Sequence, residues 1–297
     1  MTPILSIIIP CHNCVQTIDE TIQSILIQNY PNIEIILVND GSTDATEKHI
    51  REVYGHNQVI KYFEQKNSGV SAARNNGVKF SSGDYITFLD SDDLFAENKL
   101  RLQFDFLLKN HFDIVFGDLL RFEDVGNERN FFTRTSPAKT EGESYKLAVA
   151  ELDLFSYANF STGIFKRSVF DTLSWNEKRK TGEDWELWNK ISNVNYKVGN
   201  FKEVTNFYRK HQANTTKSYF EIMTLESHVA IIKDLNVSQV VKNRLIVGKL
   251  DYYSNILRNR KDRSMSQVIN FLMVCIKMPH LLSVRFLKNI IRSFSVK

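Results

Sequence analysis

The segment Phe88-Leu89-Asp90-Ser91-Asp92-Asp93 ends an apolar strand in three carboxylates within four positions. Carboxylates this close together repel one another unless a cation neutralises them. Mg²⁺ or Mn²⁺ is the usual cation, because these hard ions take one or two carboxylates and complete their shell with phosphate oxygens and water. The segment therefore predicts a strand that delivers a metal- and diphosphate-binding turn.

Two other interpretations of this turn stay open at this point. The carboxylates can form a solvated acidic turn that caps the following helix. A phosphatase with an aspartate nucleophile at a strand end also has an Asp-x-Asp pair, usually on its first strand and with Thr or Val two residues further on. Here the strand is the fourth, and Leu94 holds that position. The phosphatase pattern is thus matched only in part.

Strands and helices alternate on both sides of the acidic segment. Apolar runs predict strands at 5–9 (ended by Pro10), 33–38, 59–63, 85–89 and 114–116, and amphipathic spacing predicts helices at 17–28, 44–53, 71–80 and 99–109. This alternation predicts an α/β fold with a mostly parallel sheet and helices on both faces. Polar clusters follow four of the strands, at the carboxyl edge where open α/β sheets bind ligands.

The remainder of the chain is less regular. Residues 121–145 are polar and weakly periodic, which predicts a long loop or lid, and a helix near Glu183 and strands near 196–199 and 204–209 follow. We therefore expect one domain over 1–215, with a nucleotide-binding half at about 1–118 and an acceptor-side half at about 119–215. A basic helical C-terminal region is expected over 216–297.

Composition points to a folded protein of the cytoplasm. Hydrophobic residues make up 42% and charged residues 24% of the chain, and three cysteines make no disulfide framework. Neither a secretory signal nor a run of about 18 apolar residues is present. Cys11 and Cys14 also form a Cys-x-x-Cys pattern that redox proteins have, but that interpretation gives the acidic motifs no role.

Positive charge is concentrated at the end of the chain. Residues 241–297 contain 12 Lys or Arg against two Asp, interleaved with Leu and Phe. Such a region can lie on an anionic membrane surface, peripherally on the inner face of the cell membrane, or form a helical subdomain with a solvated basic face. Both alternatives stay open. No nucleic-acid-binding motif accompanies the charge, so nucleic acid is not an expected partner.

Three further segments carry polar groups suited to a ligand. Asp40 and its neighbours form an acidic turn with Gly41, which can bind a base or ribose or simply cap a helix. Residues 67–77 bracket Arg74 with small residues at a loop-to-helix junction, where backbone N–H groups can face an anion. Glu183 and Asp184 offer a general base, or serve only as first-turn acids of a helix.

The ordered set of these segments resembles the family 2 glycosyltransferases, inverting nucleotide-sugar enzymes with the GT-A fold. The resemblance rests on the segments 10–13, 39–44, 67–77, 88–93 and 182–185 and covers about residues 4–211. It implies that the expected α/β domain is a GT-A domain, followed by a C-terminal helical extension.

The resemblance also implies which residues hold the donor. The nucleotide and donor sugar are expected to contact Pro10, Asn13, Asp40, Asn67, Gly69, Arg74, Asp90, Ser91 and Arg209. Among these, Asp40 would bind the base, Asp90 would lie near the ribose, and Arg209 would meet the diphosphate. Asp92 and His211 would bind the cofactor, Mn²⁺ or Mg²⁺.

The implied reaction is a single displacement at the anomeric carbon. Asp184 would take the proton of the acceptor hydroxyl, with Glu183 orienting acceptor or donor. The donor would be a nucleotide-diphosphate sugar, a UDP-sugar by family tendency, and the enzyme a hexosyl- or N-acetylhexosaminyl-transferase. The acceptor would be a glycan or lipid-linked glycan in surface polysaccharide biosynthesis. The alternative is a catalytically silent nucleotide-sugar-binding or scaffold module, in which a positioned base at Asp184 has no use.

Overall fold

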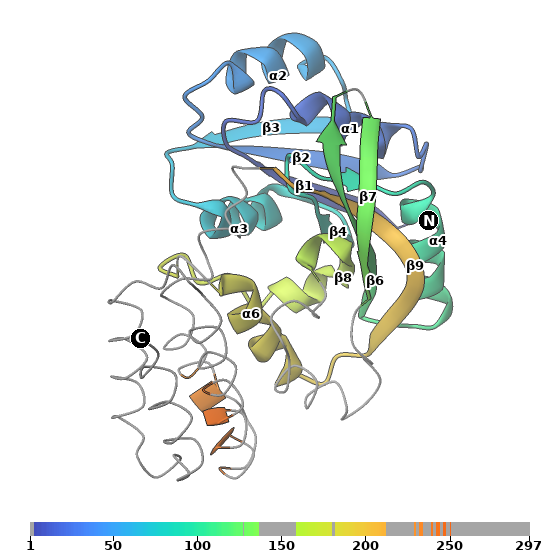
Figure 1. Cartoon of the computed structure of the whole chain (residues 1–297), viewed down its shortest axis with the longest axis vertical. Helices are drawn as coiled ribbons and strands as arrows, with labels where there is room; N and C mark the ends of the chain where they lie inside the picture. The colour runs from blue at the N-terminus through green and yellow to red at the C-terminus, as the bar shows by residue number, and fades with distance from the viewer. Residues whose placement is uncertain are drawn as a thin grey trace, which may run out of the picture. The chain divides into compact units, whose positions relative to one another are not determined.

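The computed structural model describes residues 3–126, 128–136, 159–179 and 182–211, together with single positions between 229 and 250 (Figure 1). The chain divides into two compact units, Met1–His211 and Gln212–Lys297. The first unit holds the sheet and every residue that the sequence assigns to the site. The rest of the expected lid, residues 137–145, lies outside the described residues, as does nearly all of the expected helical region at 216–297.

A nine-stranded sheet forms the centre of the first unit. Its spatial order is β3-β2-β1-β4-β8-β6-β9-β5, with β7 paired to β6. Four strands are mutually parallel, namely β3 (Ile60–Gln65), β2 (Ile33–Asp40), β1 (Leu5–Cys11) and β4 (Tyr85–Phe88). The others are β5 (Leu94–Phe95), β6 (Ile114–Val125), β7 (Glu128–Thr135), β8 (Gly163–Lys166) and β9 (Val198–Arg209). β8 is antiparallel to β4 and β6, so the sheet as a whole is mixed.

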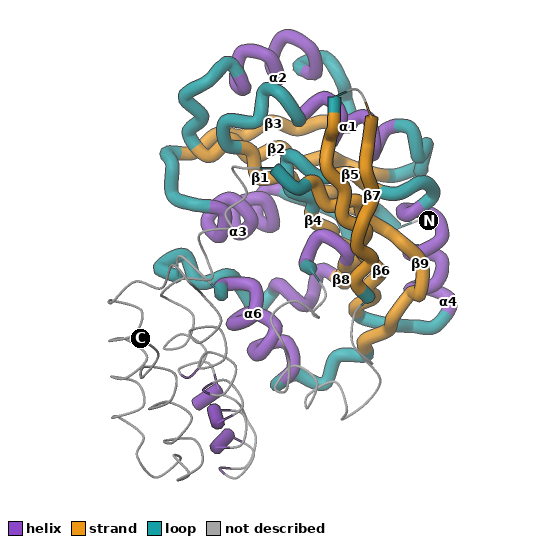
Figure 2. Tube along the Cα trace, in the orientation of Figure 1, coloured by secondary structure: helices purple, strands orange, loops and turns teal. Residues whose placement is uncertain are grey.

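Helices cover both faces of this sheet, as the sequence predicts (Figure 2). One face packs against α1 (Ile18–Leu26), α2 (Thr46–Tyr54) and α4 (Lys99–Lys109). The other face packs against α3 (Val70–Phe80) and α6 (Glu183–Ser192). Short 3₁₀ turns, Phe160–Thr162 and Arg167–Phe170, flank β8. The expected α/β fold with two covered faces is therefore confirmed.

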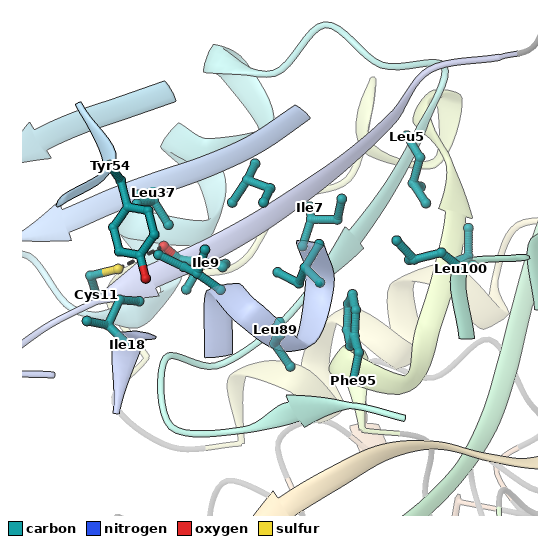
Figure 3. Close-up of a cluster of buried hydrophobic side chains, with 14 of the residues drawn as sticks. Leu5, Ile7, Ile9, Cys11, Ile18, Leu37, Tyr54, Leu89, Phe95 and Leu100 are labelled. Atoms are coloured by element: carbon teal, nitrogen blue, oxygen red, sulfur yellow. Dashed lines mark hydrogen bonds between the residues drawn. The ribbon is translucent and has the colours of Figure 1, made fainter. Parts of the chain in front are cut away.

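The apolar runs of the inner strands explain why both faces are covered. Successive side chains of a strand point to opposite faces, so Ile7 and Ile9 enter the α1 side while Ile8 enters the α3 side, all without solvent exposure. Figure 3 shows Ile7 and Ile9 packed in the first cluster, with Ile18 of α1 and Tyr54 of α2 nearby. A strand buried on both faces must be apolar throughout, and β1 satisfies this requirement.

Pro10 does not end the first strand as expected. β1 runs to Cys11, and Pro10 pairs with Val38 of β2. The pairing of β1 with β4 stops earlier, at Ile8 and Phe88. The carbonyl of Ile8 faces β4, and Pro10, two residues later, faces the same side. The N–H that proline lacks would therefore point beyond the end of β4, where no strand needs it. Proline is tolerated in a strand at such a position.

Two more expectations about the second half of the domain were wrong. Residues 121–135 are not a loop, because β6 and β7 form a long hairpin that turns at Gly126 (φ 63°). β7 is exposed along nearly its whole length. It pairs with β6 through backbone hydrogen bonds, so its sequence has no alternation of apolar and polar residues that would predict a strand. The two strands expected at 196–199 and 204–209 are one strand, β9, whose register with β6 shifts beside Gly117 and Asp118.

The described positions of the second unit are helical, and four of them, Val229, Ile232, Ile246 and Leu250, are buried. Among the residues that the structure describes, no helix is long and apolar enough to span a bilayer.

Candidate active site

Arg74 joins two acidic segments that lie far apart in the sequence. It lies in the first turns of α3 and is only 5% exposed. Its Nη2 donates to Oδ1 of Asp90 at 2.9 Å and its Nη1 donates to Oδ1 of Asp184 at 3.0 Å. Burial opposes the charge of the guanidinium, but Asp184 and Asp90 outweigh it and raise the pKa of Arg74 above its ordinary value. The two carboxylates thus share one permanent cation.

Asp184 receives a second donor from Trp175, whose Nε1 lies 2.8 Å from the same oxygen, Oδ1. No described residue donates a hydrogen bond to the other oxygen, Oδ2. Asp184 stands in the first turn of α6, directly after Gly182, which adopts a left-handed conformation (φ 70°). A partly exposed carboxylate with one free oxygen is suited to accept a proton.

Glu183 titrates far from its ordinary range. Burial, and after it the charge of Asp184, raises the pKa of Glu183 from 4.5 to about 7. Arg74 offsets part of this shift. Glu183 is therefore protonated in a large fraction of molecules at neutral pH, and its protonated oxygen can donate a hydrogen bond.

We expect the free energy of unfolding to depend on pH through Glu183. The native state binds the Glu183 proton more tightly than the unfolded chain does. The resulting contribution to the free energy of unfolding is therefore complete below pH 4.5 and is lost as pH rises towards 7. Urea unfolding of the protein and of Glu183→Gln between pH 4.5 and 8 measures it. The variant should gain stability relative to the parent across this window, by at most about 3 kcal/mol. A constant difference would contradict the assignment.

The end of β9 brings His211 to the acidic turn. His211 Nε2 lies 2.8 Å from Oδ2 of Asp92, across 119 residues of sequence. Burial, and after it the charge of Asp90, raises the pKa of Asp92, while His211 lowers it. A group of this kind binds a cation readily, because the cation removes the penalty of a buried negative charge.

The expected metal role of Asp92 and His211 stays a prediction that rests on the chemistry of their donor atoms. In this structure Nε2 of His211 and Oδ2 of Asp92 are joined directly by a hydrogen bond of 2.8 Å, so a shared ion would have to replace that contact. Among the residues that the structure describes, no group of three or more His, Cys, Asp or Glu side chains is arranged around a common metal position. Two protein donors suit Mg²⁺ or Mn²⁺, which leave several positions to water and substrate phosphates.

Threonine hydroxyls of α1 hold the acidic turn in place. Thr17 donates to the Ser91 carbonyl at 2.8 Å, and Thr21 donates to the carbonyls of Ser91 (3.0 Å) and Asp93 (2.9 Å). The Asp93 side chain is fully buried, and burial followed by the charges of its acidic neighbours raises its pKa well above the ordinary value. Asp93 therefore acts in the interior of the turn, away from solvent.

Arg209 is bound within the protein and not directed at open space. Its backbone N–H donates to Oδ1 of Asp93 at 2.9 Å, and its Nε donates to the Asp92 carbonyl at 2.9 Å. The two terminal nitrogens form ion pairs with Glu20 and Asp124. The side chain is 9% exposed. A direct diphosphate contact would require Arg209 to release these partners, so in this structure it positions the turn and the end of β9.

The carboxylate of Asp40 fixes the neighbouring loop. Its Oδ1 accepts from the N–H of Ser68 at 2.7 Å and from Gln65 Nε2 at 2.8 Å, and its Oδ2 accepts from the N–H of Gly69 at 2.8 Å. Gly69 has a positive φ of 91°, a conformation that glycine adopts freely. The expected contact of Asp40 with a base stays a prediction, and the structure shows that Asp40 shapes the loop that leads into α3.

Asn13 fastens the loop after β1 to the loop after β2. Its Oδ1 accepts from the N–H of Thr43 at 2.8 Å, and its own backbone N–H donates to Ser42 Oγ at 3.0 Å. Pro10 is buried within β1. Asn67 is exposed and packs closely against Gly41, since a Cβ added to Gly41 would lie 2.8 Å from the Asn67 backbone nitrogen. These residues line the carboxyl edge of the parallel strands, as the sequence predicts.

Five residues that contact the site were missed by the sequence reasoning. Trp175 lies nine residues before Asp184, and no spacing rule links them. Glu20 and Asp124 lie on segments that only the fold brings to Arg209. Thr17 and Thr21 carried a usable signal, since two hydroxyls four residues apart, at the N-cap and in the first turn of α1, share one face with apolar residues and Ser24.

A family model described as glycosyl transferase family 2 matches residues 6–174, more than half of the chain. The chain belongs to this family. The matched range includes Arg74 and the acidic turn at 90–93, and it ends ten residues before Asp184.

Individual family relatives cover much of the chain. The minor teichoic acid biosynthesis protein GgaB of Bacillus subtilis is 31% identical over 256 residues, 80% of this chain and 27% of GgaB. An uncharacterised glycosyltransferase of Rickettsia typhi is 33% identical over 250 residues, 84% of this chain and 76% of its own. Against several other curated relatives, the chain spans only 28% to 53% of their length.

The fold is also that of solved structures. S. aureus TarS residues 1–349, in complex with UDP-GlcNAc, matches with a TM-score of 0.68 over 95% of this chain and 82% of that one, at 18% sequence identity. This likeness confirms the GT-A fold expected from the sequence.

Proposed function

We propose that this family 2 domain transfers a sugar from a UDP-sugar to a hydroxyl of a glycan or lipid-linked acceptor, with inversion at the anomeric carbon. The observation that carries the proposal is the pairing of Arg74 with both Asp90 and Asp184 at the carboxyl edge of the sheet. That contact supports the proposal because it ties Asp184, the candidate base, to Asp90 of the acidic turn. A site for binding alone has no need of a base fixed in this way.

The chemistry needs one base and stabilisation of one leaving group. Oδ2 of Asp184 removes the proton of the acceptor hydroxyl, whose oxygen forms a bond to the anomeric carbon as the bond from that carbon to the diphosphate breaks. Attack from the face opposite the diphosphate inverts the configuration. Glu183, protonated in part at neutral pH, would donate a hydrogen bond to acceptor or donor.

Asp92 and His211 are the residues that would hold a divalent cation. When bound, Mn²⁺ or Mg²⁺ supplies charge that stabilises the departing diphosphate. Arg209 keeps the two ligands in register by binding both the Asp92 carbonyl and the Asp93 carboxylate. Thr17 and Thr21 hold the same turn from the other side.

The donor and acceptor classes draw support from relatives. TarS has been solved with UDP-GlcNAc, which favours a UDP-linked hexose or N-acetylhexosamine as the donor here. GgaB is named for teichoic acid biosynthesis, which favours an acceptor in surface polysaccharide assembly. Such an acceptor would suit an enzyme placed peripherally on the inner face of the cell membrane, with the basic stretch 241–297 as the contact.

A melting-temperature screen tests the donor and the metal together. UDP and UDP-sugars should raise the melting temperature in the presence of Mn²⁺ and have little effect after chelation, because the cation links the diphosphate to the protein. Asp92→Ala should abolish the Mn²⁺-dependent part of the shift. Asp105→Ala, an exposed position on α4, is the matched control and should keep it. An equal shift in Asp92→Ala would remove the metal role from that residue.

A further inference from the structure

Trp175 is a buried tryptophan whose single polar atom points at the candidate base. Its side chain is 2% exposed, and Nε1 lies 2.8 Å from Oδ1 of Asp184. An indole N–H only donates, and a buried one normally finds an acceptor. The acceptor here is a charged oxygen, and hydrogen bonds to charged groups are about twice as strong as neutral ones.

The protein fixes Trp175 itself from two directions. Its backbone N–H donates to Asn75 Oδ1 at 3.0 Å, and its carbonyl accepts from Asn75 Nδ2 at 3.0 Å. The ring is stacked on Phe170 (centroids 5.6 Å apart, planes at 12°) and meets Phe88 edge-on at 4.8 Å. These contacts hold the indole in the orientation that directs its N–H at Asp184.

Arg74 and Trp175 converge on the same carboxylate oxygen. Asn75 is the next residue of α3 after Arg74, so one helix turn controls both donors, Arg74 directly and Trp175 through the Asn75 amide. The guanidinium also lies 5.7 Å from the centre of the indole ring. With two donors on Oδ1, rotation of the carboxylate is restricted and Oδ2 faces away from both.

We propose that Trp175 is a positioning residue for the base: its indole N–H, with Arg74, holds Oδ1 of Asp184 so that Oδ2 receives the acceptor proton. The inference rests on the proposed function and names a residue outside the matched family segment, which ends at 174. Trp175 touches neither donor nor acceptor in this scheme. A neutral donor suits the task, because it orients the carboxylate without adding a second cation to the charge that Arg74 already supplies.

The test measures UDP release from the UDP-sugar that stabilises the protein most in the melting screen, with water as acceptor and Mn²⁺ present. Trp175→Phe keeps an aromatic ring and removes the N–H. We expect kcat to fall about 10- to 100-fold, the size of effect that a misplaced catalytic group produces, with KM for the donor within about twofold. Unchanged kcat in a folded variant would overturn the inference.

Trp188→Phe is the matched control. Trp188 belongs to the same aromatic cluster, is also 2% exposed and stacks on Phe160 at 4.3 Å, but Asp184 accepts no hydrogen bond from it. It should lower the melting temperature about as much as Trp175→Phe while leaving kcat within about threefold. Equal kcat losses in both variants would mean that cluster packing, and not the N–H, sets the rate, and would overturn the inference.

Two further measurements separate orientation from packing. Trp175→benzothienylalanine replaces the N–H by sulfur with little change of shape, and it should reproduce the kcat loss without the loss of melting temperature. In an Asp184→Asn background, Trp175→Phe should cost no more than about twofold in addition, because residues that act through one group are not additive. Full additivity would contradict action through Asp184. If the parent protein releases no UDP from any UDP-sugar, the proposed function fails first.

Discussion

Asp184→Asn is expected to reduce sugar transfer by about 10³-fold, within the 10²- to 10⁴-fold range that a general base contributes. The amide can keep its oxygen at the position of Oδ1, where Arg74 and Trp175 donate. Its nitrogen then occupies the position of Oδ2 and cannot accept a proton. The variant thus removes the proposed chemistry while preserving the geometry around it.

Two quantities are measured for Asp184→Asn and for the parent: the rate of sugar transfer and the affinity for UDP. Isothermal titration of UDP with Mn²⁺ should give a dissociation constant within about threefold of the parent, because Asp184 lies on α6 and the turn at 90–93 is unchanged. Asp105→Asn makes the same chemical change at an exposed position of α4 and should affect neither quantity. Transfer retained in Asp184→Asn would move the base to another residue. Tight UDP binding by a parent without any transfer would instead identify a silent binding module.

Arg74→Met is expected to lower the free energy of unfolding by about 3 kcal/mol, since removal of the buried guanidinium leaves Asp90 and Asp184, both partly exposed, without their shared counter-charge. The Arg74 side chain is 6% exposed, and among the described residues Arg74 is the only cation within hydrogen-bond distance of Asp90 and Asp184. For a chain of this size the loss corresponds to a fall in melting temperature of about 6–12 °C. Transfer should be lost as well, because the base and the acidic turn are no longer joined.

Arg51 offers a matched control for this variant. It also binds two carboxylates, Glu47 and Glu64, but its side chain is 53% exposed. Exposed ion pairs contribute about 0–1 kcal/mol, so Arg51→Met should change the melting temperature by no more than about 3 °C. Equal shifts for the two variants would show that burial does not give the Arg74 pairs their strength.

The parallel strands were predictable because their chemistry is local, whereas their spatial order was not predicted. β1, β2 and β4 are buried on both faces, and an apolar run between polar turns is a strong signal for such a strand. The acidic turn at 90–93 follows directly from the end of β4, so its location at the sheet edge also followed from the sequence. That the polar clusters share one sheet edge needed only the assumption that neighbouring strand ends meet, but the contacts Asp40–Gly69 and Asp90–Arg74 were not predicted.

The β6–β7 hairpin and the partners of Arg209 were not predictable in this way. β7 is solvent-exposed and pairs through its backbone, and backbone hydrogen bonds leave no residue-type signature. Arg209 binds Glu20 across 189 positions and Asp124 across 85, distances at which charge alone names no partner. The indole N–H of Trp175 was missed for a related reason, since aromatic spacing predicts core and says nothing about one polar atom.

The late position of β9 has a consequence for how the protein is made. At about 5–20 residues per second, a ribosome needs roughly 6 to 24 s to add the 119 positions that separate Asp92 from His211. During that interval the nascent chain carries the acidic turn without the histidine and without Arg209. The first strands can pair early, but Asp92 and His211 meet only when the last strand of the sheet leaves the exit tunnel. Under the proposed function, a nascent chain would gain its metal site only after the whole domain has been synthesised.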